Sequence, residues 1–361
     1  MSILLFLAVI LLLVLVHEFG HFIIAKRAGI RVDEFAFGFP PRIFKKKFGE
    51  TTYSFNALPL GGYVKIYGEN PGDVSGDVGR SFTHQSKWIQ AFVITGGVIF
   101  NLLLAWFLVT TTLIVGVPAP VDGGGGYPIS DQRLMVTGVH EKSPAEASGM
   151  KAGDVLLKLS DGNDSITPTS PEAVTSFVSG HEGYPLAVTF EHGGVVKEST
   201  VTPVSGIVPD HPAIGIYMDM VGTLKLPLHL ALLEGLKRTY EYTALTAVGI
   251  TQFLSSVVTG HSDFSQVTGP VGIVNAVGDA ASIGIVNLLL FTALISINLA
   301  VINVLPFPAL DGGRLLFIII EGVTRRPIKT NVANALNLAG FALLMLLMVV
   351  VTYHDIAKLV R

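Results

Sequence analysis

Two histidines and a glutamate interrupt an otherwise apolar segment near the start of the chain. From Ser2 to Ala25 the ionisable residues are His17, Glu18 and His21, and Ile, Leu, Val and Phe dominate the rest. A run of this length and composition is typical of a helix that crosses a bilayer. Ionisable groups in hydrocarbon cost on the order of several kcal/mol unless they are paired or bind a metal. We therefore expect these three residues to carry a function.

The spacing of the two histidines favours a metal site. On a helix, His17 and His21 project from one face about one turn apart, so both imidazoles can bind one divalent cation. Glu18 lies beside them, and the pattern HExxH is typical of zinc metalloproteases in which the glutamate is the general base. At about 1.5 Å per residue, His17 lies roughly 22 Å from the start of the helix and roughly 13 Å from Lys26. The expected site is therefore below the membrane surface, nearer the Lys26 side.

Composition places the chain among polytopic α-helical membrane proteins. Half of its 361 residues are hydrophobic, 14% are charged, and the mean hydropathy is +0.59. The absence of cysteine excludes disulfides, thiolate zinc sites and cysteine nucleophiles, which leaves His, Asp and Glu as strong metal ligands. A net charge of −3 does not indicate a nucleic-acid partner. The N-terminal segment has no basic start and carries the metal motif, so we interpret it as retained rather than cleaved.

Four apolar stretches are long enough to cross a lipid bilayer. They are residues 3–25, 89–115, 285–305 and 332–352. Residues 26–87 hold ten Lys and Arg against six acidic residues, whereas residues 118–279 hold eight against seventeen. By the positive-inside rule, the first of these connecting segments is cytoplasmic, the second is extracytoplasmic, and both termini are extracytoplasmic.

The predicted spans divide the chain into two halves of a membrane core, residues 1–117 and 285–361. Within the first half, residues 51–67 are rich in β-forming residues around Pro59 and Gly61-Gly62, which predicts a cytoplasmic β-hairpin. Two positions are open for this hairpin. It either packs against other parts of the protein and reaches toward the bilayer, or it lies on the protein surface.

Between the two halves, residues 127–205 alternate short apolar runs with turns and predict a small β-rich domain. Its segment SPAEASGMKAGD, residues 143–154, resembles a loop and short helix of PDZ domains, which bind a peptide as an added strand. A plain β spacer is the alternative. Residues 223–284 predict an amphipathic linker helix region, because a fifth crossing there would put the next polar motif on the wrong side of the membrane.

The end of the third span offers a further metal ligand. Pro306 and Pro308 break the helix near the expected cytoplasmic side, and Asp311 follows at about the depth of His17. Zinc in hydrolases usually has three protein ligands and one position for water, which favours Asp311 as the third ligand. A helix-capping role for Asp311 is the alternative. In the second span, Gly96-Gly97 and Asn101 share a face, which suits close helix packing with an amide beside the contact.

These motifs together resemble the site-2 protease family of intramembrane zinc metalloproteases, in particular the bacterial regulator-of-sigma-E protease group. The similarity covers nearly the whole chain in the right order. It rests on HEFGHF at His17, PLGGYVK at Pro59, the single PDZ-like insert, GPVGI at Gly269 and NVLPFPALDGG at Asn303. In two places the chain departs from the family pattern: Val98 stands where the second span usually has proline, and there is room for one PDZ domain rather than two.

The resemblance implies a site in which His17, His21 and Asp311 bind Zn2+ and Glu18 is the catalytic base. Two asparagines, Asn303 and Asn101, would contact the substrate, and the PDZ-like domain would gate access. The hairpin residues that would pair with the substrate as an extended strand include Leu58, Pro59, Leu60, Gly61, Gly62 and Tyr63.

The implied activity is zinc-dependent hydrolysis of peptide bonds within or next to transmembrane segments, as in regulated intramembrane proteolysis. The implied substrates are membrane proteins of the anti-sigma-factor or signal-peptide-remnant class, and the implied location is the plasma (inner) membrane. Three other functions fit parts of the sequence. They are a catalytically silent membrane scaffold that uses its PDZ-like domain, a membrane-anchored protease with soluble substrates, and a metal transporter.

Overall fold

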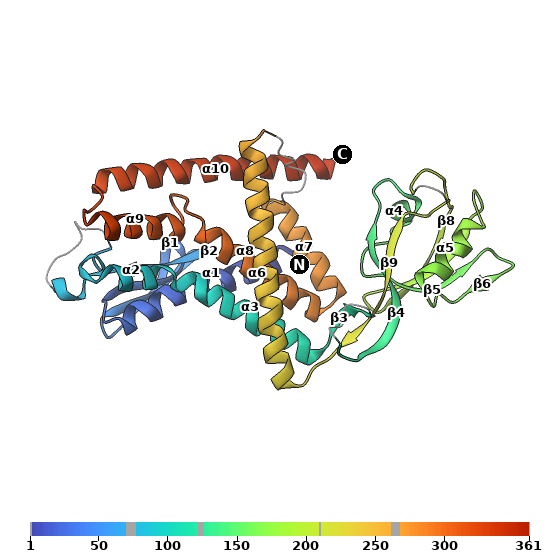
Figure 1. Ribbon diagram of the computed structural model, residues 1–361, viewed down its shortest axis with the longest axis horizontal. Coiled ribbons are helices and arrows are strands. Elements are labelled where there is room, and N and C mark those ends of the chain that lie inside the picture. The colour runs from blue at the N-terminus through green and yellow to red at the C-terminus, as the bar shows by residue number, and fades with distance from the viewer. Residues whose placement is uncertain (1, 70–76, 122–125, 209–210, 261–267, 361) are drawn as a thin grey trace. The chain divides into compact units, whose positions relative to one another are not determined.

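The computed structural model describes residues 2–69, 77–121, 126–208, 211–260 and 268–360 (Figure 1). These residues form two units. The first unit comprises Met1–Thr110, Leu232–Asp279 and Leu288–Arg361, and the second comprises Thr111–Ala231 and Ala280–Asn287. The first unit carries the apolar helices and the second carries most of the β-structure.

Among the described residues, four helices are long and apolar enough to cross a membrane, as the sequence predicted. They are α1 (Ser2–Arg27), α3 (Gly96–Val115), α8 (Ile285–Val304) and most of α10 (Thr330–Val360). The predicted second span started at residue 89, where the structure instead has a separate helix, α2 (Lys87–Ile94). Thr95 separates α2 from α3, and its hydroxyl donates to the carbonyls of Ala91 and Phe92.

The break after α8 has a clear cause. Pro306 and Pro308 cannot continue a helix, and the next helix, α9 (Asp311–Thr324), was not predicted from the sequence. A Cβ at Gly312 would lie 2.1 Å from the Leu305 carbonyl oxygen, so the returning backbone passes too close for any side chain there. This tight turn makes Asp311 the first residue of α9.

A curved β-structure packs beside α1 and consists of β1 (Val32–Phe48) and β2 (Thr51–Ile66). Residues 51–67 were predicted to form a hairpin on their own, but residues 51–66 are one strand whose partner is β1, a segment for which no structure was predicted. Both strands bend, so that Phe37 pairs with Phe55 and also with Gly62. The Phe22 ring of α1 lies 5.3 Å from Phe35, which fixes β1 against the span.

The predicted linker region contains two helices, α6 (Leu228–Val258) and α7 (Pro270–Ile283). The long helix α6 is not among the candidate spans and packs on α3, where the Trp106 indole N–H donates to the Leu232 carbonyl at 3.0 Å. Two 3₁₀ turns, η2 (Val78–Arg80) and η3 (Phe82–His84), precede α2.

The second unit is built on one antiparallel sheet with the strand order β3-β9-β4-β5-β7-β8, and β6 pairs with β5. The buried core beneath it includes Leu134, Val136, Leu159, Leu186 and Val188. The elements are β3 (Val117–Pro120), β4 (Ile129–Val139), α4 (Pro144–Ala147), β5 (Val155–Ser160), β6 (Ser165–Ile166), α5 (Pro171–Ser179), β7 (Leu186–His192), β8 (Val195–Val201) and β9 (Ile216–Leu224).

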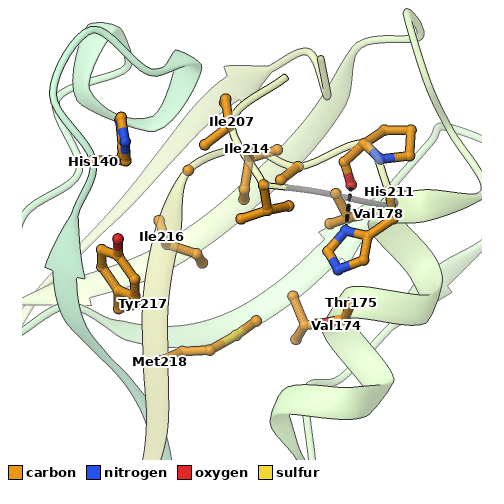
Figure 2. Close-up of a pocket in the computed structure, with 14 residues that line it drawn as sticks. His140, Val174, Thr175, Val178, Ile207, His211, Ile214, Ile216, Tyr217 and Met218 are labelled. Carbon is orange, nitrogen blue, oxygen red and sulfur yellow. Dashed lines mark hydrogen bonds between the residues drawn. The ribbon is translucent and has the colours of Figure 1, made fainter. Parts of the chain in front are cut away.

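The boundaries of this PDZ-like domain differ from the predicted 127–205. β9 lies between β3 and β4, so the sheet extends from residue 117 to residue 224. Both added strands pair with segments distant in the sequence, which local patterns do not indicate. A mainly apolar pocket lies where α5 faces β9, and Val174 and Val178 of α5 face Ile216 and Met218 of β9 across it (Figure 2).

Candidate metal centre

The predicted metal ligands converge at one point of the first unit. His17 and His21 lie one turn apart on α1, and their Nε2 atoms are 3.2 Å from each other. Asp311 Oδ2, at the start of α9, lies 3.1 Å from His17 Nε2 and 3.3 Å from His21 Nε2. Both histidines are buried, and Asp311 is half-buried. The structure thus brings together two segments that are almost 300 residues apart.

This cluster has the geometry of a zinc site. Three ligand atoms at about 2.0–2.1 Å from one tetrahedral zinc ion lie roughly 3.3–3.4 Å from one another, close to the three separations observed. His21 Nδ1 lies 2.9 Å from the Val93 carbonyl oxygen, which can only accept, so Nδ1 carries the proton and Nε2 presents its lone pair to the cluster. Lone pairs of an imidazole and a carboxylate that face each other at this distance require a cation or a proton between them.

Asp311 does not act as a helix cap. The N-cap of α9 is Leu310, and no side-chain capping hydrogen bond is formed there. The carboxylate instead turns toward the two imidazoles, which favours the ligand interpretation over the capping alternative.

The close contact between α1 and α3 depends on glycines, and one of them lies against the two histidines. A Cβ at Gly97 would lie 2.4 Å from His17 Cε1 and 2.5 Å from His21 Nε2. A Cβ at Gly20 would lie 2.2 Å from the Gly96 carbonyl oxygen, so the two backbones are in contact. The predicted packing role of Gly96-Gly97 is confirmed, and the glycines also make room for the metal ligands.

Asn101 lies behind His17, on the side away from the cluster. Its terminal amide nitrogen is 3.2 Å from His17 Nδ1, and its backbone carbonyl accepts the Ser296 hydroxyl of α8 at 2.8 Å. Both Asn101 and Ser296 are fully buried. A half-turn of the amide would let its oxygen accept the Nδ1 proton that His17 carries when Nε2 is a metal ligand. The geometry favours a role in orienting His17 over the predicted contact with substrate.

A cavity of roughly 240 Å³ opens beside the cluster. It is lined by His17, Glu18, His21, Tyr63, Val64, Ile66, Glu69, Ile94, Asp311 and Arg314. The Val64 backbone N–H of β2 is hydrogen-bonded to the Glu18 carboxylate, so the strand reaches the candidate base directly. The cavity therefore holds the candidate ligands, the candidate base and one end of β2.

Some of the other predicted site residues line this cavity or lie beside Glu18, and others are not among its lining residues. Tyr63 lines it, and an ideal Cβ on Gly62 would lie 3.7 Å from the Glu18 side chain. Leu58 and Pro59 are exposed, Gly61 lies against the Phe39 ring, and the Leu60 side chain is outside the described part of the chain. Asn303, at the end of α8, is half-buried and is not among the residues that line the cavity.

Two charged residues of the cavity, Arg314 and Glu69, were not predicted to belong to the site. Arg314 follows Asp311 by three residues on α9, and its guanidinium forms an ion pair with Glu69, which follows β2. Three-residue spacing after a ligand on a helix is a signal that could have identified Arg314, once α9 is known to be a helix. Glu69 gives no comparable signal, because its position in a turn after a strand does not determine where its side chain points.

A chain with several spans and an HExxH helix completed by a distant carboxylate has the features of a membrane metallohydrolase. Comparison with known proteins agrees, because the model of peptidase family M50 matches residues 5–347. The chain belongs to this family, the site-2 proteases, and is a zinc metalloendopeptidase of the membrane.

Relatives match over almost their whole length. The zinc metalloprotease RasP of Geobacillus kaustophilus is 32% identical, with 99% of this chain and 98% of RasP covered. A candidate zinc metalloprotease of Clostridium perfringens is 36% identical over 95% of each chain. The solved PDZ domain of an SdrC-like protein from Listeria monocytogenes aligns with 25% of this chain and 92% of its own, at 20% identity and a TM-score of 0.22.

Replacing Asn101 by leucine, which is similar in size but apolar, is expected to lower zinc affinity by about 10- to 100-fold, because His17 loses the group that orients it. Competition with a zinc chelator measures this affinity in the purified protein. The matched control is Asn298→Leu, because Asn298 lies on α8 and its amide bonds within its own helix. A raised KM with unchanged zinc affinity would instead support the substrate-binding role.

Proposed function

We propose that the protein hydrolyses peptide bonds within or next to transmembrane segments of membrane proteins. The observation that carries this proposal is the position of the metal cluster. His17 and His21 belong to α1, a helix apolar enough to span a membrane, and Asp311 follows the break at the end of α8, another such helix. A protease anchored for soluble substrates would be expected to carry its ligands outside such helices.

Zinc held by His17, His21 and Asp311 would supply a Lewis acid that acidifies water and polarises the scissile carbonyl. Glu18 is the proposed general base, and it lines the same cavity as the ligands. Its carboxylate would take a proton from the attacking water and deliver it to the leaving amine. The Val64 backbone lines the same cavity beside this carboxylate.

The proposed substrate is an extended segment, because a helix hides its carbonyls in internal hydrogen bonds. The edge of β2 at Gly62–Val64 lies beside Glu18, so a segment paired with that edge would pass the candidate base. Tyr63, which lines the cavity, would contact this segment, and Leu58 and Pro59 would extend the pairing edge. Asn303 would hold the substrate from the end of α8.

We further propose that the protein lies in the plasma membrane with the PDZ-like domain and both termini extracytoplasmic, as the charge distribution predicts. The chain has no cysteine, so single cysteines can report orientation without a background signal. Asn163→Cys in the PDZ-like domain should react with a membrane-impermeant maleimide in intact cells, whereas Lys46→Cys in β1 should react after permeabilisation. The reverse pattern would reject this orientation.

The activity is tested with purified protein in liposomes and a model single-span peptide that has a helix-destabilising residue in its span. Glu18→Gln is expected to keep about one zinc per chain and to lose cleavage by at least about 100-fold, because the base is removed and the ligands remain. Mass spectrometry of the products locates the cut.

The matched control is Glu241→Gln on α6, where the side chain is half exposed and pairs with Lys237. This variant should cleave like the wild type. Cleavage confined to extramembrane loops of the peptide, or undiminished cleavage by Glu18→Gln, would contradict the proposal.

A further inference from the structure

The cavity beside the metal cluster contains one guanidinium group. Arg314 lies one turn after Asp311 on α9, so both side chains emerge on the same face of that helix. The cavity lining also includes the carboxylates of Glu18, Glu69 and Asp311. Among the described lining residues, Arg314 is the one that stays positively charged at every physiological pH.

Arg314 already binds a carboxylate. Its guanidinium forms an ion pair with Glu69, which lies in the turn directly after β2. A guanidinium has five N–H donors in a planar fork that matches a carboxylate, and Arg314 donates from this fork to the Glu69 carboxylate. The group is therefore a carboxylate-binding site that the chain fills with one of its own side chains.

The ion pair is accessible from the cavity. The side chains of Arg314 and Glu69 are 45% and 22% exposed. Both residues line the metal-site cavity and also a second cavity, which includes Gln90 and Asn337. Arg314 and Glu69 therefore border the same cavity as the metal ligands.

Peptide hydrolysis creates a carboxylate at this place. The C–N bond breaks, the oxygen of water joins the acyl carbon, and the leaving amine takes both protons of that water, so the N-terminal product ends in a carboxylate and the other product begins with an ammonium group. That group forms beside Glu18 and Asp311, which carry the same sign of charge. Arg314 adds a protein cation that offsets this repulsion, in addition to the zinc ion that the three ligands would hold.

We infer that Arg314 binds the new C-terminal carboxylate of the N-terminal cleavage product, and that Glu69 is a built-in competitor that holds Arg314 until this carboxylate forms. The inference rests on peptide hydrolysis, which family membership establishes, and not on the location of the scissile bond in a membrane span. Arg314 thereby acts as a binding residue for product.

The test compares two apolar peptides that are identical except for a C-terminal carboxylate or a C-terminal amide. Their dissociation constants are measured for the full chain in detergent after removal of metal with a chelator, so that metal ligation of the carboxylate does not contribute. The wild type should bind the carboxylate form about tenfold more tightly than the amide.

Two variants separate this role from a purely structural ion pair. Arg314→Gln should abolish the preference for the carboxylate, and Arg314→Lys should retain part of it. Glu69→Gln breaks the same ion pair but frees the guanidinium, so it should bind the carboxylate several-fold more tightly than the wild type and leave amide binding unchanged. A structural role predicts that Glu69→Gln has no such effect.

The matched control is Lys87→Gln, which removes an ion pair with Glu321 that lies outside the metal-site cavity. It should leave both dissociation constants unchanged. The inference is overturned if the wild type shows no preference for the carboxylate, including the case in which neither peptide binds, or if Arg314→Gln keeps the preference. These outcomes do not depend on where in its substrate the protease cuts.

Discussion

The metal cluster places two imidazoles and a carboxylate among helices that can span a membrane, and the Glu18 carboxylate lies beside them. Each of these groups needs a partner there. Left unpaired there, each group would oppose folding by on the order of several kcal/mol. The protein meets this constraint by directing the groups at one another, with His17, His21 and Asp311 converging within 3.3 Å. Most of the first unit can be understood as the scaffold that this convergence requires.

Glycine supplies much of that scaffold. The contact of Gly20 with Gly96 brings the α1 and α3 backbones together, and Gly97 leaves the space that the imidazoles occupy. Gly312 lets the chain turn sharply enough after α8 to start α9 at the ligand. Because each of these close contacts is with backbone or with a metal ligand, a methyl group could not be accommodated by a simple change of rotamer. The hydrolytic site therefore depends on close backbone packing as much as on its polar residues.

The sequence predicted those parts of the protein that depend on local pattern. Apolar length located the four spans, the i, i+4 spacing located His17 and His21, and the two prolines located the break before Asp311. It could not predict β1 as the partner of β2, nor β9 as a strand between β3 and β4, because strand pairing across long sequence separations leaves no local periodicity. The ion pair between Arg314 and Glu69 was missed for the same reason. Both residues look like ordinary surface charges until α9 and the end of β2 are placed side by side.

Asn101 illustrates a contact that a sequence motif alone does not indicate. The sequence and the family resemblance indicated a polar residue close to the chemistry. Only the three-dimensional contacts with His17 and Ser296 indicate that its amide faces a ligand rather than the cavity. This contact supports the proposal that Asn101 orients His17.

His17, His21 and Asp311 are proposed to form one zinc site, and X-ray absorption spectroscopy at the zinc edge of the purified, fully loaded protein tests this proposal. We expect about one zinc per chain with two imidazole nitrogens at about 2.0–2.1 Å and the remaining ligands oxygen. A spectrum with three or more imidazoles, with oxygen ligands alone, or with zinc well below one per chain would contradict it.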